Sequence, residues 1–343
     1  MKTTAMKMTK PALAIAIASI VSAQGVSAAD ADTEQRLESL EERLQYTEQR
    51  LKAQDDTILA QQEGNSLSIG GVIEVEATSS EGEQDLSIAT VELGIGADIT
   101  DGVSGEIVLL YEGDTLDVDT ATITVAPEGS AASFTVGQFV VPFGTYDTNL
   151  LSDPLTLDMG ETGDSGVIQA DFEAGAATIS AYAFNGQDDG DINDFGINLG
   201  FALEDAGLGV NLGMINNFQG EEVNAIALSA MYENGPFTVI AEHVRASDAM
   251  ADGTEPSATN LELGYGTLLG GKPSTFAIAY QTTDDAQNLE NDDAEPLVAE
   301  KRLAAALTIG IMENTGLGFE IAKDTDYADE SSNTFTAKLS VEF

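Results

Sequence analysis

The chain has 343 residues, no cysteine and a formal net charge of −46 at pH 7, from 59 acidic and 13 basic side chains. This charge excludes a basic nucleic-acid-binding patch, because phosphate contacts require clustered Lys and Arg. The missing cysteine excludes a disulfide framework, a thiolate nucleophile and a thiolate metal site. The length allows a large core or more than one domain.

Residues 1–29 are predicted to be a signal peptide. Lys2, Lys7 and Lys10 form a basic start, the apolar run PALAIAIASIVSA follows, and the small residues VSAA end the segment. This order is typical of a secretory signal with cleavage after Ala28 or Ala29. An uncleaved membrane anchor is the alternative, but the apolar run is short for a span and the small-residue site follows it directly.

Residues 30–63 are predicted to form a periplasmic helix with a short coiled-coil repeat. A helix this polar has little to bury alone, so we expect it to pair with copies of itself or with another partner, and we favour self-association that supports a homotrimer. A solvated linker helix is the alternative. The apolar positions recur every seven residues, with one at the companion position: Leu37, Leu44, Leu51 and Ile58, with Leu40.

Residues 64–343 alternate between apolar and polar positions, which is the period of a β-strand with one apolar face. The runs SLSIGGVIEVEA and NTFTAKLSVEF, which begin at Ser66 and Asn333, show the pattern most clearly. Between the runs, seven tight turns alternate with eight longer or more acidic connections, beginning with one at residues 79–84. This predicts an all-β transmembrane barrel of about sixteen antiparallel strands in the cell outer membrane. A soluble multi-strand sandwich is the alternative.

The predicted barrel implies which partners the protein contacts. The terminal Phe343 ends an alternating apolar run, which resembles the C-terminal signature that the barrel assembly machinery reads. The outer membrane and its lipopolysaccharide are the expected surroundings. The acidic loop with Asp188, Asp189, Asp191 and Asp194 is interpreted as solvated, with divalent-cation bridging to lipopolysaccharide as the sharper hypothesis.

Residues 142–164 form the third longer connection, which is half apolar. The pattern resembles that of sixteen-stranded trimeric porins, whose third outer loop folds into the lumen and narrows the pore. We therefore expect Leu150, Leu151, Leu155 and Leu157 to lie against the wall, with the acids toward water. The candidate constriction residues are Pro142, Phe143, Gly144, Asp147, Asp153, Asp158 and Glu161.

Acids on the strands are candidates for the lumen, because inward Asp and Glu favour cations. Alternation places Glu74, Glu76, Glu106 and Glu242 in this group, together with Asp117 and Asp119.

The sequence offers little for catalysis, and the protein is predicted not to be an enzyme. The single histidine, His243, is interpreted as an interfacial or lumen residue, although a serine–histidine hydrolase would have to use it. No Gly-rich phosphate loop and no His or Cys metal spacing is present, so no catalytic residue, cofactor or metal is expected.

The run VPFGTYDTNLLSDPLTLDMGET, from Val141, and the heptad leader before the barrel resemble the LbtU-type siderophore porin family. The resemblance implies an outer-membrane channel for TonB-independent uptake of small solutes, with ferric siderophores as the expected solute. A strongly acidic lumen would repel an anionic siderophore unless basic residues offset it. The alternatives are a general, cation-favouring diffusion porin and a structural protein that ties the outer membrane to the cell wall. The residues that could offset the acids are Arg245, Lys272, Lys301 and Arg302.

Overall fold

The computed structural model describes residues 66–112, 115–162, 164–186, 192–289 and 297–343. The predicted signal peptide and coiled-coil helix, with Leu37, Leu40, Leu44, Leu51 and Ile58, lie outside the described residues. No helix in the described ranges is long and apolar enough to cross a membrane.

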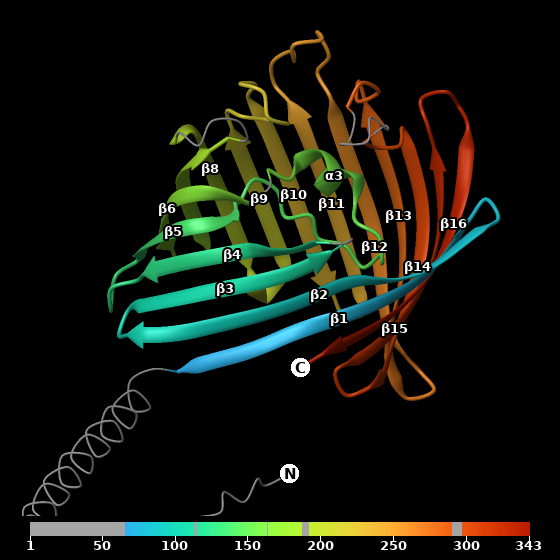
Figure 1. The fold of residues 1–343 in the computed structure, drawn as a ribbon, viewed down its shortest axis with the longest axis horizontal. Helices are drawn as coiled ribbons and strands as arrows, with labels where there is room; N and C mark the ends of the chain where they lie inside the picture. Colours follow the sequence, from blue (N-terminus) through green and yellow to red (C-terminus); the bar gives the residue numbers. More distant parts are fainter. Residues whose placement is uncertain (1–65, 113–114, 163, 187–191, 290–296) are drawn as a thin grey trace, which may run out of the picture. The chain divides into compact units, whose positions relative to one another are not determined.

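Sixteen antiparallel strands close into a barrel in which each strand pairs with its neighbours in sequence and β1 pairs with β16 (Figure 1). The predicted barrel and its strand number are confirmed. The strands are β1 Leu67–Ser80, β2 Glu83–Thr100, β3 Val103–Glu112, β4 Thr115–Val125, β5 Ala132–Val140, β6 Asp164–Ala174, β7 Ala177–Asn185, β8 Ile192–Leu203, β9 Leu208–Ile215, β10 Ala225–Asn234, β11 Phe237–Ala246, β12 Ser257–Leu269, β13 Lys272–Asp284, β14 Lys301–Met312, β15 Thr315–Thr325 and β16 Ser331–Glu342.

The two faces of the wall differ in polarity, as β12 illustrates. Leu261 and Leu263 are about half exposed, at 51% and 45%, whereas Asn260 and Glu262 between them are 0% and 4% exposed. Apolar side chains therefore cover the outside of the barrel, and polar side chains are buried inside it. This arrangement suits a barrel that meets lipid on its outer face, because a closed sheet leaves no unpaired backbone edge there.

The connections differ from the predicted alternation in three places. The connection expected near 113–117 is shorter, because β3 ends at Glu112 and β4 begins at Thr115. The first connection was expected to be long, but Glu81 and Gly82 alone form the turn, both with positive φ. The polar residues Glu83 to Asp85 instead continue the β1–β2 ladder, because backbone pairing does not require apolar side chains. The turn expected near 127 is longer and spans residues 126–131. The strand number is unaffected.

The connection between β5 and β6 does not stay beside these strands. Its short helix, α3 (Leu155–Gly160), contacts β11, β12 and β13 and lies within the ring of strands (Figure 1). We call residues 141–162 the inner loop. Its side chains Phe143, Leu155 and Met159 belong to the largest buried apolar cluster. The apolar core therefore lies inside the barrel, between the inner loop and one part of the wall.

Candidate functional site: a loop fastened inside the barrel

A buried wall carboxylate joins the first part of the inner loop to α3. Glu242 of β11 accepts hydrogen bonds at Oε1 from the backbone N–H groups of Thr145, at 2.9 Å, and Tyr146, at 3.3 Å. Its Oε2 accepts a hydrogen bond of 2.8 Å from Thr156 Oγ1, in α3. Glu242 is only 2% exposed, so the loop covers it completely. Hydrogen bonds to an ionised acceptor are stronger than neutral ones, and this residue makes three.

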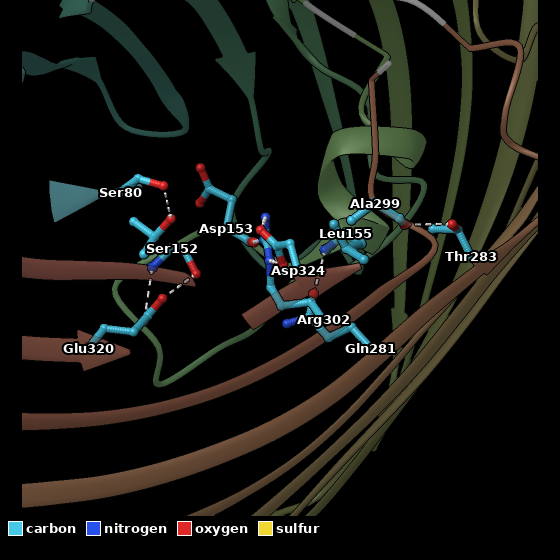
Figure 2. A network of polar contacts seen from close by, with 11 residues as sticks. Ser80, Ser152, Asp153, Leu155, Gln281, Thr283, Ala299, Arg302, Glu320 and Asp324 are labelled. Carbon is cyan, nitrogen blue, oxygen red and sulfur yellow. Dashed lines mark hydrogen bonds and ion pairs between the residues drawn. The ribbon is translucent and has the colours of Figure 1, made fainter. Parts of the chain in front are cut away.

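Two further carboxylates hold the middle of the inner loop. Glu262 of β12 accepts hydrogen bonds of 2.7 Å from Thr148 Oγ1 and from both the backbone N–H and Nδ2 of Asn149. Glu320 of β15 accepts from the Leu151 N–H at 2.6 Å and from Ser152 through its N–H and Oγ (Figure 2). Three strands thus supply one carboxylate each, and every one of them binds loop donors.

The start of α3 is capped from the wall. Pro154 precedes the helix and provides no side-chain cap. Gln281 of β13 instead accepts a hydrogen bond of 2.8 Å from the Leu155 N–H (Figure 2). Free N–H groups in a first helical turn need such a partner when they are buried. At the other end of the helix, Gln219 Nε2 donates to the carbonyl of Met159.

Small wall residues let the inner loop approach closely. Leu150 packs in a buried cluster with wall alanines. A Cβ at Gly213 would lie 1.9 Å from the carbonyl oxygen of Phe143, and one at Gly318 would lie 2.5 Å from Cδ2 of Leu151. Larger side chains at these positions would push the loop away from the wall. The alanines are Ala277, Ala279, Ala304, Ala306 and Ala322.

A cavity of about 440 Å³ remains on the other side of the inner loop. It lies between the loop and the wall around the β1–β16 junction. Its lining contains five acidic and two basic side chains. The lining residues are Glu74, Glu76, Ala89, Thr90, Glu112, Leu151, Ser152, Asp153, Asp158, Arg302, Thr336 and Lys338.

Both basic residues of the cavity are bound to acids and to the inner loop. Lys338 Nζ lies 3.0 Å from Glu74 Oε2 and 2.9 Å from Glu76 Oε1, and it donates to the Leu151 carbonyl at 3.2 Å. Arg302 pairs with Asp324 through Nε, at 2.8 Å, and Nη2, at 3.3 Å. Its Nη1 donates to the Asp153 carbonyl at 2.9 Å (Figure 2). These cations therefore fasten the loop and neutralise wall acids.

Nearby cations neutralise the inner-loop acids of the cavity less fully than the wall acids. Burial raises the pKa of the Asp158 carboxyl to about 6, and the nearby Arg302 guanidinium opposes this only in part. Burial also raises the pKa of Asp153, against the lowering effect of Lys338 and Arg302. Asp158 therefore titrates close to neutral pH, where it can change the charge of the cavity.

The other candidate residues of the inner loop have different surroundings. Phe143 is buried in the core, and Tyr182 Oη donates to the Pro142 carbonyl at 3.2 Å. The ring of Tyr146 lies against Gly144, where a Cβ would be 2.4 Å from its Cζ. Two residues line separate, smaller cavities, Asp147 one of about 250 Å³ and Glu161 one of about 60 Å³.

The candidate lumen acids are also divided. Glu74 and Glu76 line the 440 Å³ cavity, whereas Glu242 is buried beneath the inner loop. Glu106 is exposed and lines none of these three cavities.

His243 bonds through Nδ1 to Thr259 Oγ1 at 2.9 Å, and its cross-strand partner is the outward-facing Leu228.

Sequence reasoning missed Glu262, Glu320 and Gln281 as partners of the inner loop. Glu262 and Glu320 each lie between two outward apolar residues, and Gln281 follows the outward Tyr280, so alternation would have placed them on the inner face. Their loop partners lie 113 to 169 residues away, and no local pattern signals such contacts. In the acidic loop near 188, residues 187–191 lie outside the described residues. The expectation of a solvated loop is wrong for Asp194, which lies on β8, is 4% exposed and accepts hydrogen bonds from Asn216 and Asn217. Within the described ranges, no three His, Asp or Glu side chains form a group that could hold a metal ion.

The barrel, its inner loop and its inward polar face define a porin-like β-barrel. Several solved structures share this fold. DcaP, an outer-membrane channel of Acinetobacter baumannii, matches with a TM-score of 0.60 and 15% identity over 82% of this chain and 98% of that one. An anion-selective porin from Comamonas acidovorans matches with a TM-score of 0.60, 13% identity, and coverage of 81% and 100%. OmpF of Salmonella typhi matches with a TM-score of 0.60, 14% identity, and coverage of 82% and 99%.

Curated sequences also include relatives of low identity. The chain is 22% identical over 323 residues to the "UPF0422 protein lpl2888" of Legionella pneumophila strain Lens. It is 23% identical over 322 residues to the "UPF0422 protein lpp3030" of strain Paris. Each match covers 76% of this chain and 59% of the relative, so the chain spans about three fifths of the length of these relatives. No family model matches the chain.

Proposed function

We propose that the protein is an outer-membrane channel for passive diffusion of small solutes. The 440 Å³ cavity between the inner loop and the wall around the β1–β16 junction is its narrow part. The observation that carries this proposal is the fastening of the inner loop to β11, β12, β13 and β15, beside which the cavity stays open. The apolar outer face and the porin-like fold support an outer-membrane location.

The charges of the cavity support a cation-favouring channel. Five carboxylates line it, and its two cations are both bound to carboxylates. Acidic linings raise the local concentration of cations and lower that of anions. This favours the general diffusion porin among the functions that the sequence suggested.

Planar-bilayer recordings across a KCl gradient test the proposal. We expect open channels with a reversal potential that shows K⁺ to be more permeant than Cl⁻. The preference should weaken as the pH falls from 7.5 to 5, since Asp158, with a pKa of about 6, loses its charge on protonation. Asp158→Asn should lower the preference at pH 7.5 and remove much of this pH dependence. A folded barrel without conductance would contradict the channel and favour the structural role.

Ferric siderophore uptake is the second candidate function. It is supported by the inner-loop run that starts at Val141 and resembles siderophore porins. The acidic cavity restricts this candidate to complexes without net negative charge, because the bound cations leave little to attract an anion. Growth of a deletion strain on a ferric siderophore under iron limitation tests it. Unchanged growth and unchanged iron uptake would rule the candidate out.

A homotrimer in contact with lipopolysaccharide is also proposed, with Phe343 as the signal for barrel assembly. Trimers are supported by the related fold of Vibrio cholerae OmpT, which has a trimer form. Replacing Leu37, Leu44 and Leu51 with Asn should weaken the oligomer if the heptad helix drives assembly. Heat resistance of the oligomer on a gel measures this. An equally resistant oligomer would show that barrel contacts suffice.

A further inference from the structure

We propose that the 440 Å³ cavity binds small organic dications, such as linear diamines, as they pass. This inference rests on the proposed channel function and adds the class of solute. Hydrogen-bond donors and acceptors around the cavity are mismatched. Most of the strong donors there are already in use, whereas several charged acceptors are not.

Most donors of both cations are occupied. The Lys338 ammonium has three protons, and three oxygen atoms lie within 3.2 Å of it, on Glu74, Glu76 and Leu151. Three of the five N–H groups of the Arg302 guanidinium are used, two with Asp324 and one with the Asp153 carbonyl. An anionic solute would have to break these contacts to reach Lys338, and at Arg302 it would compete with the bound Asp324. The cavity therefore offers a carboxylate little to bind.

Several hydrogen-bond acceptors of the cavity, in contrast, have no donor. Among the described residues, no hydrogen bond reaches the carboxylates of Glu112, Asp153 and Asp158, which all line the cavity. Each ionised carboxylate can accept several hydrogen bonds. A solute that brings N–H donors and positive charge supplies what this lining lacks. Ammonium groups meet both requirements.

The shape of the site favours a dication with an alkyl spacer. Glu112 is on β3, whereas Asp153 and Asp158 belong to the inner loop, so the free acids approach from two elements. A volume of about 440 Å³ exceeds what one inorganic cation fills. Leu151 and Ala89 add apolar surface to the lining. A diamine can place one ammonium group at each set of acids and lay its methylene chain along this surface.

The test uses the full mature chain in planar bilayers, with KCl conductance recorded first. Addition of 1,4-diaminobutane should reduce the K⁺ current reversibly and to saturation. The double variant Asp153→Asn/Asp158→Asn should raise the half-blocking concentration at least about tenfold, the loss expected from one charged hydrogen bond. Glu106→Gln is the matched control, because it removes an acid that does not line the cavity. Succinate and 1,4-butanediol, of similar length, should not block at the same concentrations.

A binding measurement separates this inference from the proposed channel. Isothermal titration of the detergent-folded barrel with 1,4-diaminobutane needs no open pore, and it should detect binding that the double variant weakens about tenfold or more. Diamine binding without KCl conductance would contradict the channel function but support the diamine site. The diamine site would be overturned, and the channel function supported, by KCl conductance together with any one of three results. These are no diamine binding, equal block by succinate, and unchanged diamine block in the double variant.

Discussion

Deletion of residues 150–157 should raise single-channel conductance roughly twofold or more, because a sixteen-stranded barrel without a lumen-filling loop encloses a wide aqueous channel. The deleted segment contains Leu150, Leu155 and Thr156, which the wall buries. Single-channel recording in KCl measures the change. Heat-modifiable gel mobility and a far-ultraviolet dichroism spectrum of β-sheet verify that the barrel still closes.

The same deletion should also increase cation preference. Removal of the segment takes away one cavity acid, Asp153, but it frees two others. Glu242 and Glu320 lose all or part of their hydrogen bonding and become exposed to water. These buried carboxylates would then become lumen charges, which attract cations. Wild-type conductance in a folded deletion variant would place the inner loop outside the solute path. Greater conductance with unchanged selectivity would contradict the wall positions of the two acids.

Replacement of Glu242 by Ala should loosen the inner loop, which is the second large expected effect. The substitution leaves the N–H groups of Thr145 and Tyr146 and the hydroxyl of Thr156 without their acceptor. Each buried donor that loses its partner costs about 1–3 kcal/mol. Fluctuating, larger single-channel currents and faster hydrogen exchange at residues 145–156 are expected. Steady wild-type currents together with unchanged exchange would show that the other anchors suffice.

The variant Glu242→Gln distinguishes hydrogen bonding from charge. A glutamine oxygen can accept from both backbone N–H groups, while its amide can donate to Thr156 Oγ1. The Gln variant should therefore keep much more of the loop order than the Ala variant. Glu106→Ala serves as a control for loss of an acid inside the barrel. Equal disorder in the Gln and Ala variants would indicate that the charge of Glu242 holds the loop.

The wall of the barrel was predictable because its signal is local. In β12, Leu261 and Leu263 alternate with Asn260 and Glu262, and lipid and interior impose opposite polarity on neighbouring positions. The length of the first connection was not predictable in the same way. Polar residues from Glu83 continue the ladder because backbone pairing is indifferent to them there.

Local sequence patterns do not predict which wall residues the inner loop contacts. Its apolar content and its position in the chain suggested a path inside the barrel. Glu242 was among the expected lumen acids, but the loop covers it, while Glu74 and Glu76 share Lys338 beside the open cavity. All three occupy inward positions on their strands, so alternation alone cannot separate them.

The amino-acid sequence alone determined the number of strands, the apolar outer face and the inward position of the acids. These properties depend on neighbouring residues and on the two-residue period of a strand. Only the tertiary structure decided which acids hold the inner loop and which line the cavity. That distinction depends on which donors reach each carboxylate, and these donors come from segments 86 to 169 residues away across a closed barrel.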